Sequence, residues 1–514
     1  MDIIQTLSDE LKRLLQGNLL YQEYYDTWEY LLESYIGGQE YKNARHLTRY
    51  QLETDEEYNA RIKSTPLENH CRSVISTYNS FLFRERPYRY FADVAAYPEV
   101  ESFLWDADYE GRTLNNFMKE ASTWSSVFGH CWVVVSKPNV GAATLAEERA
   151  LGVRPYVSVL TPMVVLDWDY TRQPNGRVEL TYFRYLEDTT GDLSTVKEWT
   201  PEFIKTNVVD TGKDMVIEEI IEDNQLGMVP VVCVYNGRSV IRGFGVSDIV
   251  DIADAQKFIY NATSEVEQSI RLDSHPSLVK TPETQAGIGA GSLINMPENL
   301  DPGLKPYLLE FGGASIDSIY SSIKHTIEAI DKMANTGAVR ATESRSMSGV
   351  AMETEFQLLN ARLSEKRDNL ELAEEGIWTL FFAYLGMPWN GYVKYADTFN
   401  IRDTKTEIEQ LKIAKETATD PIVLRQIDEA ILYWMGKGKD ELEYQDINPI
   451  EGRTYPDGEE IPSSLPPAYV IATDASVPPE QNCSNCYYYN AGEGYCTLFD
   501  ANVRANYWCA KWKR

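Results

Sequence analysis

The stretch GVAMETEFQLLNARLSEKRDNLELAEEGIWTLFFAYL, residues 349–385, decides how the chain is read. Apolar side chains recur in it at three- and four-residue steps, from Phe356 and Leu359 to Leu380 and Tyr384, which is the period of one helical face. At 1.5 Å per residue the predicted helix is about 55 Å long. Such a helix needs partners along its whole apolar face. Other helices of the chain can supply some of these contacts, and neighbouring subunits would supply the rest.

Two more long helices and a β-rich unit are predicted upstream of this stretch. Isoleucines at helical spacing indicate helices over 247–272 and 315–335. Residues 273–314, between them, have the pattern of short strands broken by Gly and Pro. Residues 128–240 are rich in Val, Tyr and Phe and contain a turn at Pro174–Gly176. We therefore expect a β-rich unit that includes a hairpin.

The remaining segments are predicted to be helices, one short β piece and a tether. The expected helices are 1–36, 55–83 with a kink or split at Pro66, 98–126, 404–417 and 421–435, and the β piece is 392–399. Residues 446–482 are rich in proline, which is typical of an extended tether. The fold class we expect is therefore α+β and mainly helical.

The net charge of the 514-residue chain is -30. A protein that coats DNA needs clustered Lys and Arg to replace the counterions of the phosphates, so this chain is not expected to coat DNA broadly. The acidity favours solubility, or a surface past which nucleic acid moves without sticking. No run of about 20 apolar residues is present, so we expect no transmembrane helix and no membrane partner. The N-terminus has no signal-like pattern, and we expect folding in a cytoplasm.

Motifs of common catalysts are missing from the sequence. It contains no phosphate-binding Gly-x4-Gly-Lys-Ser/Thr loop, no His-Glu-x-x-His pair and no Gly-x-Ser-x-Gly elbow. The five histidines are scattered, and each is more typical of a core or surface position than of a metal ligand. We therefore expect the body of the chain not to be an enzyme.

The order of the predicted elements resembles that of the portal proteins of tailed bacteriophages, which are the head-to-tail connectors. Three short stretches carry the resemblance: Gly245–Asp248 leading into Asp254–Asn261, Ser348–Ala351 at the start of the long helix, and Glu57–Arg61. The resemblance covers roughly residues 20 to 440. It implies a ring of twelve copies at one vertex of the virion, through which double-stranded DNA is packaged and ejected.

The resemblance also implies an organisation into named regions. These are a wing at 1–246, a first stem helix at 247–272, a clip at 273–314, a second stem helix at 315–335, a tunnel loop at 336–348, the long wing helix and β piece at 349–403, and a crown at 404–445. The Pro-rich tether at 446–482 and the cysteine-containing module at 483–514 depart from the usual family pattern.

Partners and DNA contacts are implied by the same resemblance. Arg340 and Arg345 of the tunnel loop would face DNA, as a few cations in a mainly acidic channel. Solvation, or salt bridges between subunits, is the alternative role for both residues. The expected partners are other copies of the chain, terminase, the major capsid protein and a head–tail adaptor. Assembly would take place in the host cytoplasm.

Four of the seven cysteines lie together near the C-terminus. Cys483 and Cys486 are two residues apart, and Cys496 and Cys509 follow after nine and twelve intervening residues. In a chain without a secretory signal, clustered cysteines indicate a metal before they indicate disulfides. Four thiolates suit zinc or an iron–sulfur cluster. A zinc ribbon usually has a second Cys-x2-Cys pair, so the split second half favours the cluster over zinc, with two disulfides as a third alternative.

Aromatic residues surround these cysteines. The expected shell of the centre is Tyr487, Tyr495, Phe499, Trp508 and Trp512. The series from Cys483 to Trp512 is similar to high-potential iron–sulfur proteins, which implies a [4Fe-4S] cluster, although the gap of nine is short for that family.

We expect the metal centre to be structural and to stabilise a small module that docks on a subunit or partner. The alternative from another class is a redox protein whose cluster transfers electrons and whose body is a scaffold.

Overall fold

The computed structural model describes most of the chain in two compact units. The described residues are 7–91, 98–141, 145–274, 277–279, 285–286, 294–295, 301, 305, 307–309, 314–340, 349–396, 399, 411–415, 427, 431, 455, 461–462, 465, 469–472, 481–492, 494–499 and 501–509. The hairpin unit comprises residues 27–77 and 248–359, and the sheet unit comprises the remainder.

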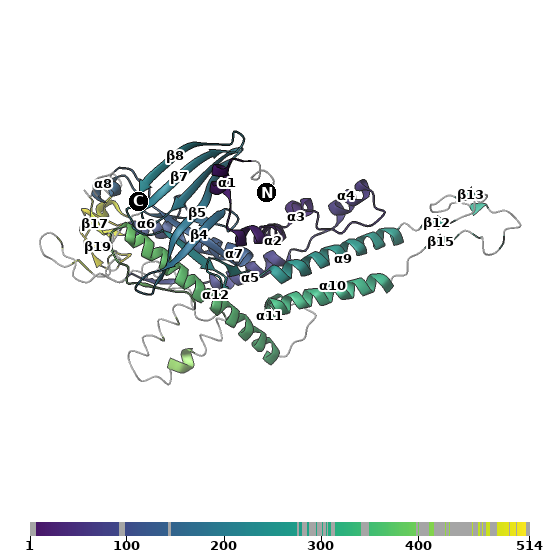
Figure 1. Cartoon of the computed structure of the whole chain (residues 1–514). Helices are drawn as coiled ribbons and strands as arrows, with labels where there is room; N and C mark the ends of the chain where they lie inside the picture. The colour runs from purple at the N-terminus through teal and green to yellow at the C-terminus, as the bar shows by residue number, and fades with distance from the viewer. Residues whose placement is uncertain are drawn as a thin grey trace. The chain divides into compact units, whose positions relative to one another are not determined.

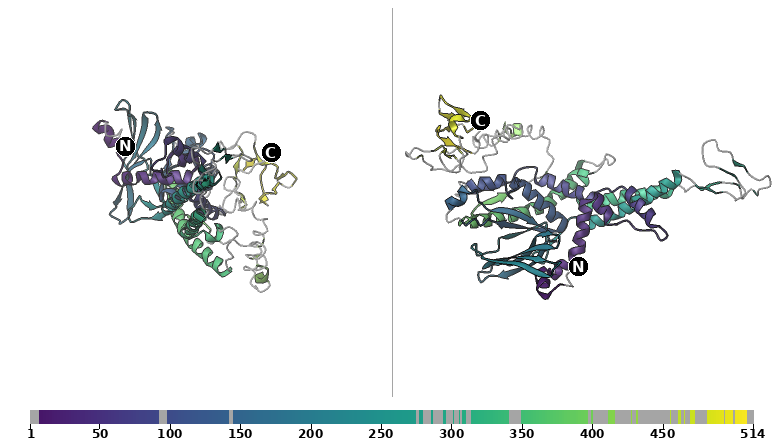
Figure 2. Two further views of the ribbon diagram at one scale, coloured as in Figure 1. Left: turned by 90° about the vertical axis from the view of Figure 1, so that its right-hand side faces the viewer. Right: turned by 90° about the horizontal axis from the view of Figure 1, so that it is seen from above.

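The hairpin unit is built on two long helices that lie side by side, α9 (Val250–Ser274) and α10 (Ala314–Met333) (Figures 1 and 2). Ile252 and Ile259 of α9 are buried, as are Ile323 and Ile330 of α10. The connection between the two helices contains short antiparallel strand pairs. These are β12 (Ser277–Val279) with β15 (Tyr307–Leu309), and β13 (Gln285–Ala286) with β14 (Ile294–Asn295). The helix α11 (Gly337–Arg340) follows α10.

Two short helices, α3 (Gly38–Asn43) and α4 (Asp55–Ser64), pack with α9 in the same unit. Their core joins Tyr41 and Tyr58 to Tyr260 of α9. Thr54 caps α4 through a reciprocal pair of hydrogen bonds with Glu57, which fixes where the helix begins.

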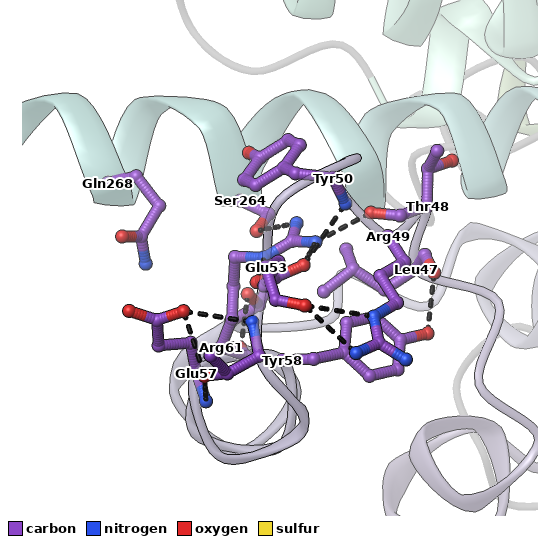
Figure 3. A network of polar contacts seen from close by, with 12 residues as sticks. Leu47, Thr48, Arg49, Tyr50, Glu53, Glu57, Tyr58, Arg61, Ser264 and Gln268 are labelled. Carbon is purple, nitrogen blue, oxygen red and sulfur yellow. Dashed lines mark hydrogen bonds and ion pairs between the residues drawn. The ribbon is translucent and has the colours of Figure 1, made fainter.

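A buried arginine ties the α4 segment to α9 (Figure 3). The Arg61 guanidinium donates to both carboxylate oxygens of Glu53, at 2.7 and 2.8 Å, and to the hydroxyl of Ser264 on α9, at 3.1 Å. It also donates to the carbonyl of Thr48 at 2.6 Å and lies 4.0 Å from the ring centre of Tyr50. The hydrogen bond from Arg61 lowers the pKa of Glu53. Such a charge is tolerated in the interior because it is paired and hydrogen-bonded.

The sheet unit contains a five-stranded antiparallel meander in sequence order. Its strands are β4 (Val165–Arg172), β5 (Val178–Thr190), β6 (Leu193–Trp199), β7 (Phe203–Asp210) and β8 (Met215–Asp223). The helix α1 (Asp9–Leu15) packs Leu11 and Leu15 against Val196 and Val209 of this sheet. A second sheet has the order β3 (Tyr156–Leu160), β2 (His130–Ser136), β9 (Val231–Tyr235), and a short pair joins β10 (Gly237–Arg238) to β11 (Gly245–Val246).

A buried histidine at the start of β2 completes a closed hydrogen-bond network. The backbone N–H of Gly245 donates to His130 Nδ1 at 3.3 Å, so the proton of the neutral ring lies on Nε2, which contacts the hydroxyl of Tyr21. That hydroxyl also accepts from Trp132 Nε1 at 3.0 Å and donates to the carbonyl of Gly243 at 2.7 Å. Burial lowers the pKa of His130 to about 3. The ring is therefore neutral at physiological pH.

The long helix α12 (Gly349–Tyr384) packs its C-terminal half into the sheet unit. Trp378 lies against Phe91 and Phe103, at ring-centre distances of 4.7 and 5.2 Å. Glu374 of α12 is buried and accepts hydrogen bonds from Arg89 and Tyr395. Other helices of this part of the chain are α5 (His70–Leu82), α6 (Pro98–Trp105) and α7 (Leu114–Phe128), and strand β1 (Tyr88–Tyr90) pairs with β16 (Tyr392–Lys394). The chain also forms α2 (Leu19–Ile36) and α8 (Leu145–Ala150).

The prediction of an α+β, mainly helical chain is confirmed, and the three long helices begin and end within a few residues of the expected positions. The split of the 55–83 helix near Pro66 and the hairpin at Pro174–Gly176 are also confirmed. Among the described residues, no helix is long and apolar enough to cross a membrane. The expected helices 404–417 and 421–435 lie mostly outside the described residues.

Two helices were predicted too long, and one part of the sheet was missed. The 98–126 helix is interrupted between α6 and α7, where Tyr109 and Gly111 have positive φ. The 1–36 helix is interrupted between α1 and α2, where the backbone N–H of Asn18 donates to Leu166 instead of continuing a helix. Strands β6, β7 and β8 were expected only as part of a β-rich unit, because their charged side chains hide the apolar alternation.

Candidate metal centre

The C-terminal module is built from very short elements. A 3₁₀ turn, η4 (Cys483–Asn485), precedes a three-stranded sheet of β18 (Tyr489–Asn490), β19 (Tyr495–Cys496) and β20 (Ala501–Asn502). A separate pair joins β17 (Val470–Ile471) to β21 (Tyr507–Trp508). Each strand has two residues, so backbone pairing alone holds little of this module together.

Each of the four cysteines comes from a defined position in these elements. Cys483 opens the 3₁₀ turn and Cys486 closes it, with the N–H of Cys486 donating to the carbonyl of Cys483 at 3.1 Å. Asn485 fixes the start of the turn by accepting from the N–H of Asn482 at 3.1 Å. Cys496 lies on β19, and Cys509 directly follows β21. The fold thus brings together thiols that are far apart in sequence.

The thiol of Cys483 is influenced by the other three cysteines of the module. Burial first, and then the neighbouring Cys509, Cys486 and Cys496, together raise the pKa of Cys483 to about 12. Cys483, Cys496 and Cys509 are buried in one apolar cluster, and Cys486 is half-buried. All seven cysteines of the chain lie in described positions, and none of them forms a disulfide. Within the described residues, no group of three or more His, Cys, Asp or Glu has the arrangement that would hold a metal ion.

The donor chemistry nevertheless fits a thiolate-bound centre. Zinc and iron–sulfur clusters both take four cysteines, and both require the thiol protons to leave. A buried thiol such as Cys483, with three other thiols acting on it, is unfavourable as an isolated anion, and a cationic centre would offset that cost. Cys483, Cys486, Cys496 and Cys509 are the residues that could hold it.

The expected aromatic shell is found only in part. Phe499 packs against the apolar cluster of the cysteines, and Trp508 is half-buried with its Nε1 donating to Gln481 at 2.9 Å. Tyr495 is half-buried on β19. Tyr487 is 72% exposed, so its assignment to the shell is wrong. It lies in the turn after Cys486 and leaves the inward positions to Tyr488 and Tyr489; Trp512 lies outside the described residues.

Part of the core of the module comes from the segment predicted as a tether. Tyr455, Leu465 and Tyr469 are buried in the same cluster as the cysteines, and Val470 pairs with Trp508. The expected boundary between a tether at 446–482 and a module at 483–514 is therefore wrong. The run of apolar residues from Tyr469 to Ala472 was the signal in the sequence that could have indicated a strand there.

Of the two arginines expected to face DNA, the described residues include Arg340. Arg340 ends α11 and is largely buried, with Nη1 3.1 Å from Asp331 and Nη2 2.9 Å from His70 Nδ1. Arg345 lies outside the described residues. A DNA contact by either residue stays a prediction.

Comparisons with solved structures and with sequences give the following matches. The chain is similar to a chain in the neck of an empty GTA particle computed with C6 symmetry, at 11% identity and a TM-score of 0.45, covering 76% of this chain and 99% of that one. It is also similar to a chain in the virion of a native gene transfer agent (GTA) particle, at 11% identity and a TM-score of 0.42, covering 76% and 97%. A third match, in the neck of a native GTA particle computed with C12 symmetry, has 10% identity and a TM-score of 0.40, covering 77% and 98%.

No curated protein matches the chain. The family model described as "High potential iron-sulfur protein" matches residues 468–514, which contain all four cysteines of the module and strands β17 to β21. The C-terminal module is thus similar in sequence to high potential iron-sulfur proteins.

Proposed function

We propose that the chain is the subunit of a portal ring, the structural component through which DNA enters and leaves a virus-like particle. The observation that carries the proposal is the hairpin unit, in which α9 and α10 lie side by side and are joined through paired strands. The order of helix, short strands and helix, followed by the long helix α12, agrees with the stem–clip–stem order that the sequence resemblance implies. In this proposal residues 247–272 and 315–335 are the stem and residues 273–314 the clip. The wing, tunnel loop and crown keep the boundaries stated above.

Exposed apolar side chains on the hairpin support assembly into a ring. Phe258 of α9 and Tyr320 of α10 are 49% and 52% exposed, and Ile270 is exposed as well. Large apolar groups on helices of this length are unfavourable in water, and contiguous ones mark interaction surfaces. In a closed ring, other copies of the chain would cover them. The resemblance implies twelve copies, and we propose that number.

The charge of the chain suits a channel for DNA. A net charge of -30 disfavours strong adhesion of a polyanion, which must move freely during packaging and ejection. Arg340 and Arg345 of the tunnel loop would supply a few guiding cations. The proposed partners are terminase, the major capsid protein and a head–tail adaptor, and the proposed location is the portal vertex of the virion.

The module at the C-terminus would hold a [4Fe-4S] cluster, with zinc as the alternative. The match to high potential iron-sulfur proteins and the four neighbouring thiols support the cluster. We propose that the centre is structural, because a module whose strands have two residues each gains most of its stability from a bound centre. Repeated around a ring, the module would dock on a neighbouring subunit or another partner.

The test of the ring is electron microscopy of the purified chain combined with metal analysis of the same sample. We expect rings with a central channel, together with iron, sulfide and a broad absorption band at roughly 400 nm. A protein that stays monomeric under every assembly condition would contradict the portal proposal. A colourless protein containing zinc would contradict the cluster and leave the ring standing.

A matched pair of variants tests whether the hairpin makes the ring. Phe258→Glu places a charge on the exposed side of α9, and we expect it to lower the fraction of rings strongly in mass photometry. Val240→Glu is the control, because Val240 is fully exposed between β10 and β11 of the sheet unit. Equal ring fractions for the two variants would contradict the role of the α9 surface.

A further inference from the structure

We propose that the side chains of Tyr455 and Leu465 form an additional wall of the cysteine module, which shields the metal centre from water. This inference rests on the proposed iron–sulfur centre. The wall lies outside the region that resembles high potential iron-sulfur proteins, since that match begins at residue 468. The folded module of this chain is therefore larger than the part matched by the family model.

The ring of Tyr455 is held on two sides. The guanidinium of Arg504 lies 3.7 Å from the centre of the Tyr455 ring, which is the geometry of a cation–π contact. The ring of Tyr507 meets Tyr455 edge to face, with ring centres 5.2 Å apart and an interplanar angle of 90°. Tyr455 is 5% exposed as a result. Both partners come from the loop and strand that immediately precede Cys509.

A second tyrosine connects the wall to the same strand. Tyr469 stacks on Tyr507, with ring centres 4.9 Å apart, and its hydroxyl accepts from the backbone N–H of Arg504 at 2.7 Å. The next residues form β17, which pairs Val470 with Trp508. The N–H of Ala472 then donates to the carbonyl of Asn506 at 2.8 Å. The upstream segment is thus bonded to the chain leading to Cys509 by backbone and side chain alike.

The wall shares one apolar core with three of the cysteines. Tyr455 and Leu465 of the wall belong to the cluster that contains Cys483, Cys496 and Cys509, as does Tyr469 of the matched region. A protein surface that excludes water from an iron–sulfur centre affects both its potential and its persistence. The loss of surrounding groups around a metal site commonly weakens metal retention by about 10- to 100-fold. Removal of the Tyr455 ring should therefore open the centre to solvent without touching any ligand.

The experiment compares Tyr455→Ala with Tyr487→Ala in the full-length ring. The two variants remove the same side chain from the same module, but Tyr455 is buried and Tyr487 is 72% exposed. The first readout is the rate at which the absorption near roughly 400 nm is lost during exposure to EDTA and air. We expect Tyr455→Ala to lose it about 10-fold faster than the wild type, and Tyr487→Ala to match the wild type. Tyr455→Phe, which keeps the ring, should stay within about twofold of the wild type.

The second readout is hydrogen exchange of residues 501–509, which needs no bound centre. Faster exchange there in Tyr455→Ala than in Tyr487→Ala supports the wall, and equal exchange together with equal loss of absorption overturns it. A wild-type protein without iron would contradict the proposed cluster. Hydrogen exchange alone would then test the wall. The two readouts therefore distinguish an error in the proposed cluster from an error in the proposed wall.

Discussion

The five-stranded sheet of the body and the cysteine module are both built from antiparallel strands, yet they are held together by different means. Strands β4 to β8 have seven to thirteen residues each and pair in sequence order, and α1 covers one face with leucines. The strands of the module have two residues each, and its core contains three cysteines. The body can fold on its own packing, whereas the module depends on aromatic contacts and on whatever the thiols bind.

The body and the cysteine module differ in how their buried polar groups are stabilised. In the body, buried polar groups such as Arg61, Glu374 and His130 are satisfied by side chains and backbone of the protein itself. In the module, the buried thiol of Cys483 is close to three other thiols that cannot stabilise its anion. A buried polar site of this kind is completed from outside the polypeptide.

The largest effect is expected from removal of a cysteine ligand. Cys509→Ser should abolish the absorption near roughly 400 nm and release the module from its folded state, while ring formation by the body persists. Absorption spectroscopy and electron microscopy of the same preparation measure the two outcomes. Cys233→Ala, in strand β9 of the body, is the control and should keep the cluster. Loss of the rings in Cys509→Ser would show that the two regions are not independent.

A large effect is also expected from breaking a buried ion pair of the body. Arg61→Ala leaves the carboxylate of Glu53 buried beside α9 without its cation, which costs about 3–5 kcal/mol of the free energy of unfolding. Urea unfolding measures the loss, and the absorption of the cluster should not change. Arg362→Ala, which removes a half-buried partner of the exposed Glu365, should cost less than about 1 kcal/mol. Similar losses in the free energy of unfolding for the two variants would mean that the buried ion pair of Arg61 adds no more to stability than the surface pair.

Acid should destabilise the body through His130. The folded protein keeps this ring neutral down to a pH of about 3, whereas an unfolded histidine takes up a proton near roughly 6.5. The unfolded state therefore binds more protons below that pH, and stability falls as the pH is lowered. At a pH of about 5 the loss from this residue is roughly 2 kcal/mol.

Unfolding of the wild type and of His130→Gln between roughly pH 7 and 5 measures how steeply the free energy of unfolding falls with pH. The variant should be less stable at neutral pH and less sensitive to acid. Some sensitivity should remain, because burial also lowers the pKa of His70 in the hairpin unit. If stability depended on pH to the same extent in His130→Gln as in the wild type, His130 would not be the source of the acid sensitivity.

The smallest effect is expected at the cap of α4. Thr54→Ala removes the hydroxyl that accepts from the N–H of Glu57, and should cost about 1 kcal/mol. Thr54→Ser keeps the hydroxyl acceptor and should cost only roughly a few tenths of a kcal/mol. Differential scanning calorimetry resolves the two variants, and equal transition temperatures would show that the cap is not formed.

Much of the body could be predicted because its signals are periodic. The isoleucines of α9 and α10 and the apolar stripe of α12 repeat at helical spacing over 20 residues or more, so the helices were placed closely. The breaks after Trp105 and before Leu19 were missed because they depend on left-handed residues and on a hydrogen bond to a distant strand. Four of the nine residues of β8 are charged, and they do not alternate with the apolar residues.

The spacing of the cysteines is enough to propose a ligand set for the candidate centre, but it does not predict the residues that surround the cysteines. Cys-x2-Cys fixes a turn through local geometry, so Cys483 and Cys486 are readable from the sequence. The position of Tyr455 depends on contacts with Arg504 and Tyr507, about fifty residues away, and no local pattern encodes such contacts. The high proline content of residues 446–482 predicts a tether, and the apolar run that starts at Tyr469 is too short to predict a strand against it.

The pairing of β17 with β21 has a mechanical consequence. A tension transmitted along the chain from the body reaches Tyr455 first, then the two-residue pair of Val470 and Ile471, and only afterwards the turn that begins at Cys483. The edge-to-face contact of Tyr455 and the short strand pair would therefore bear such a load before the turn that begins at Cys483.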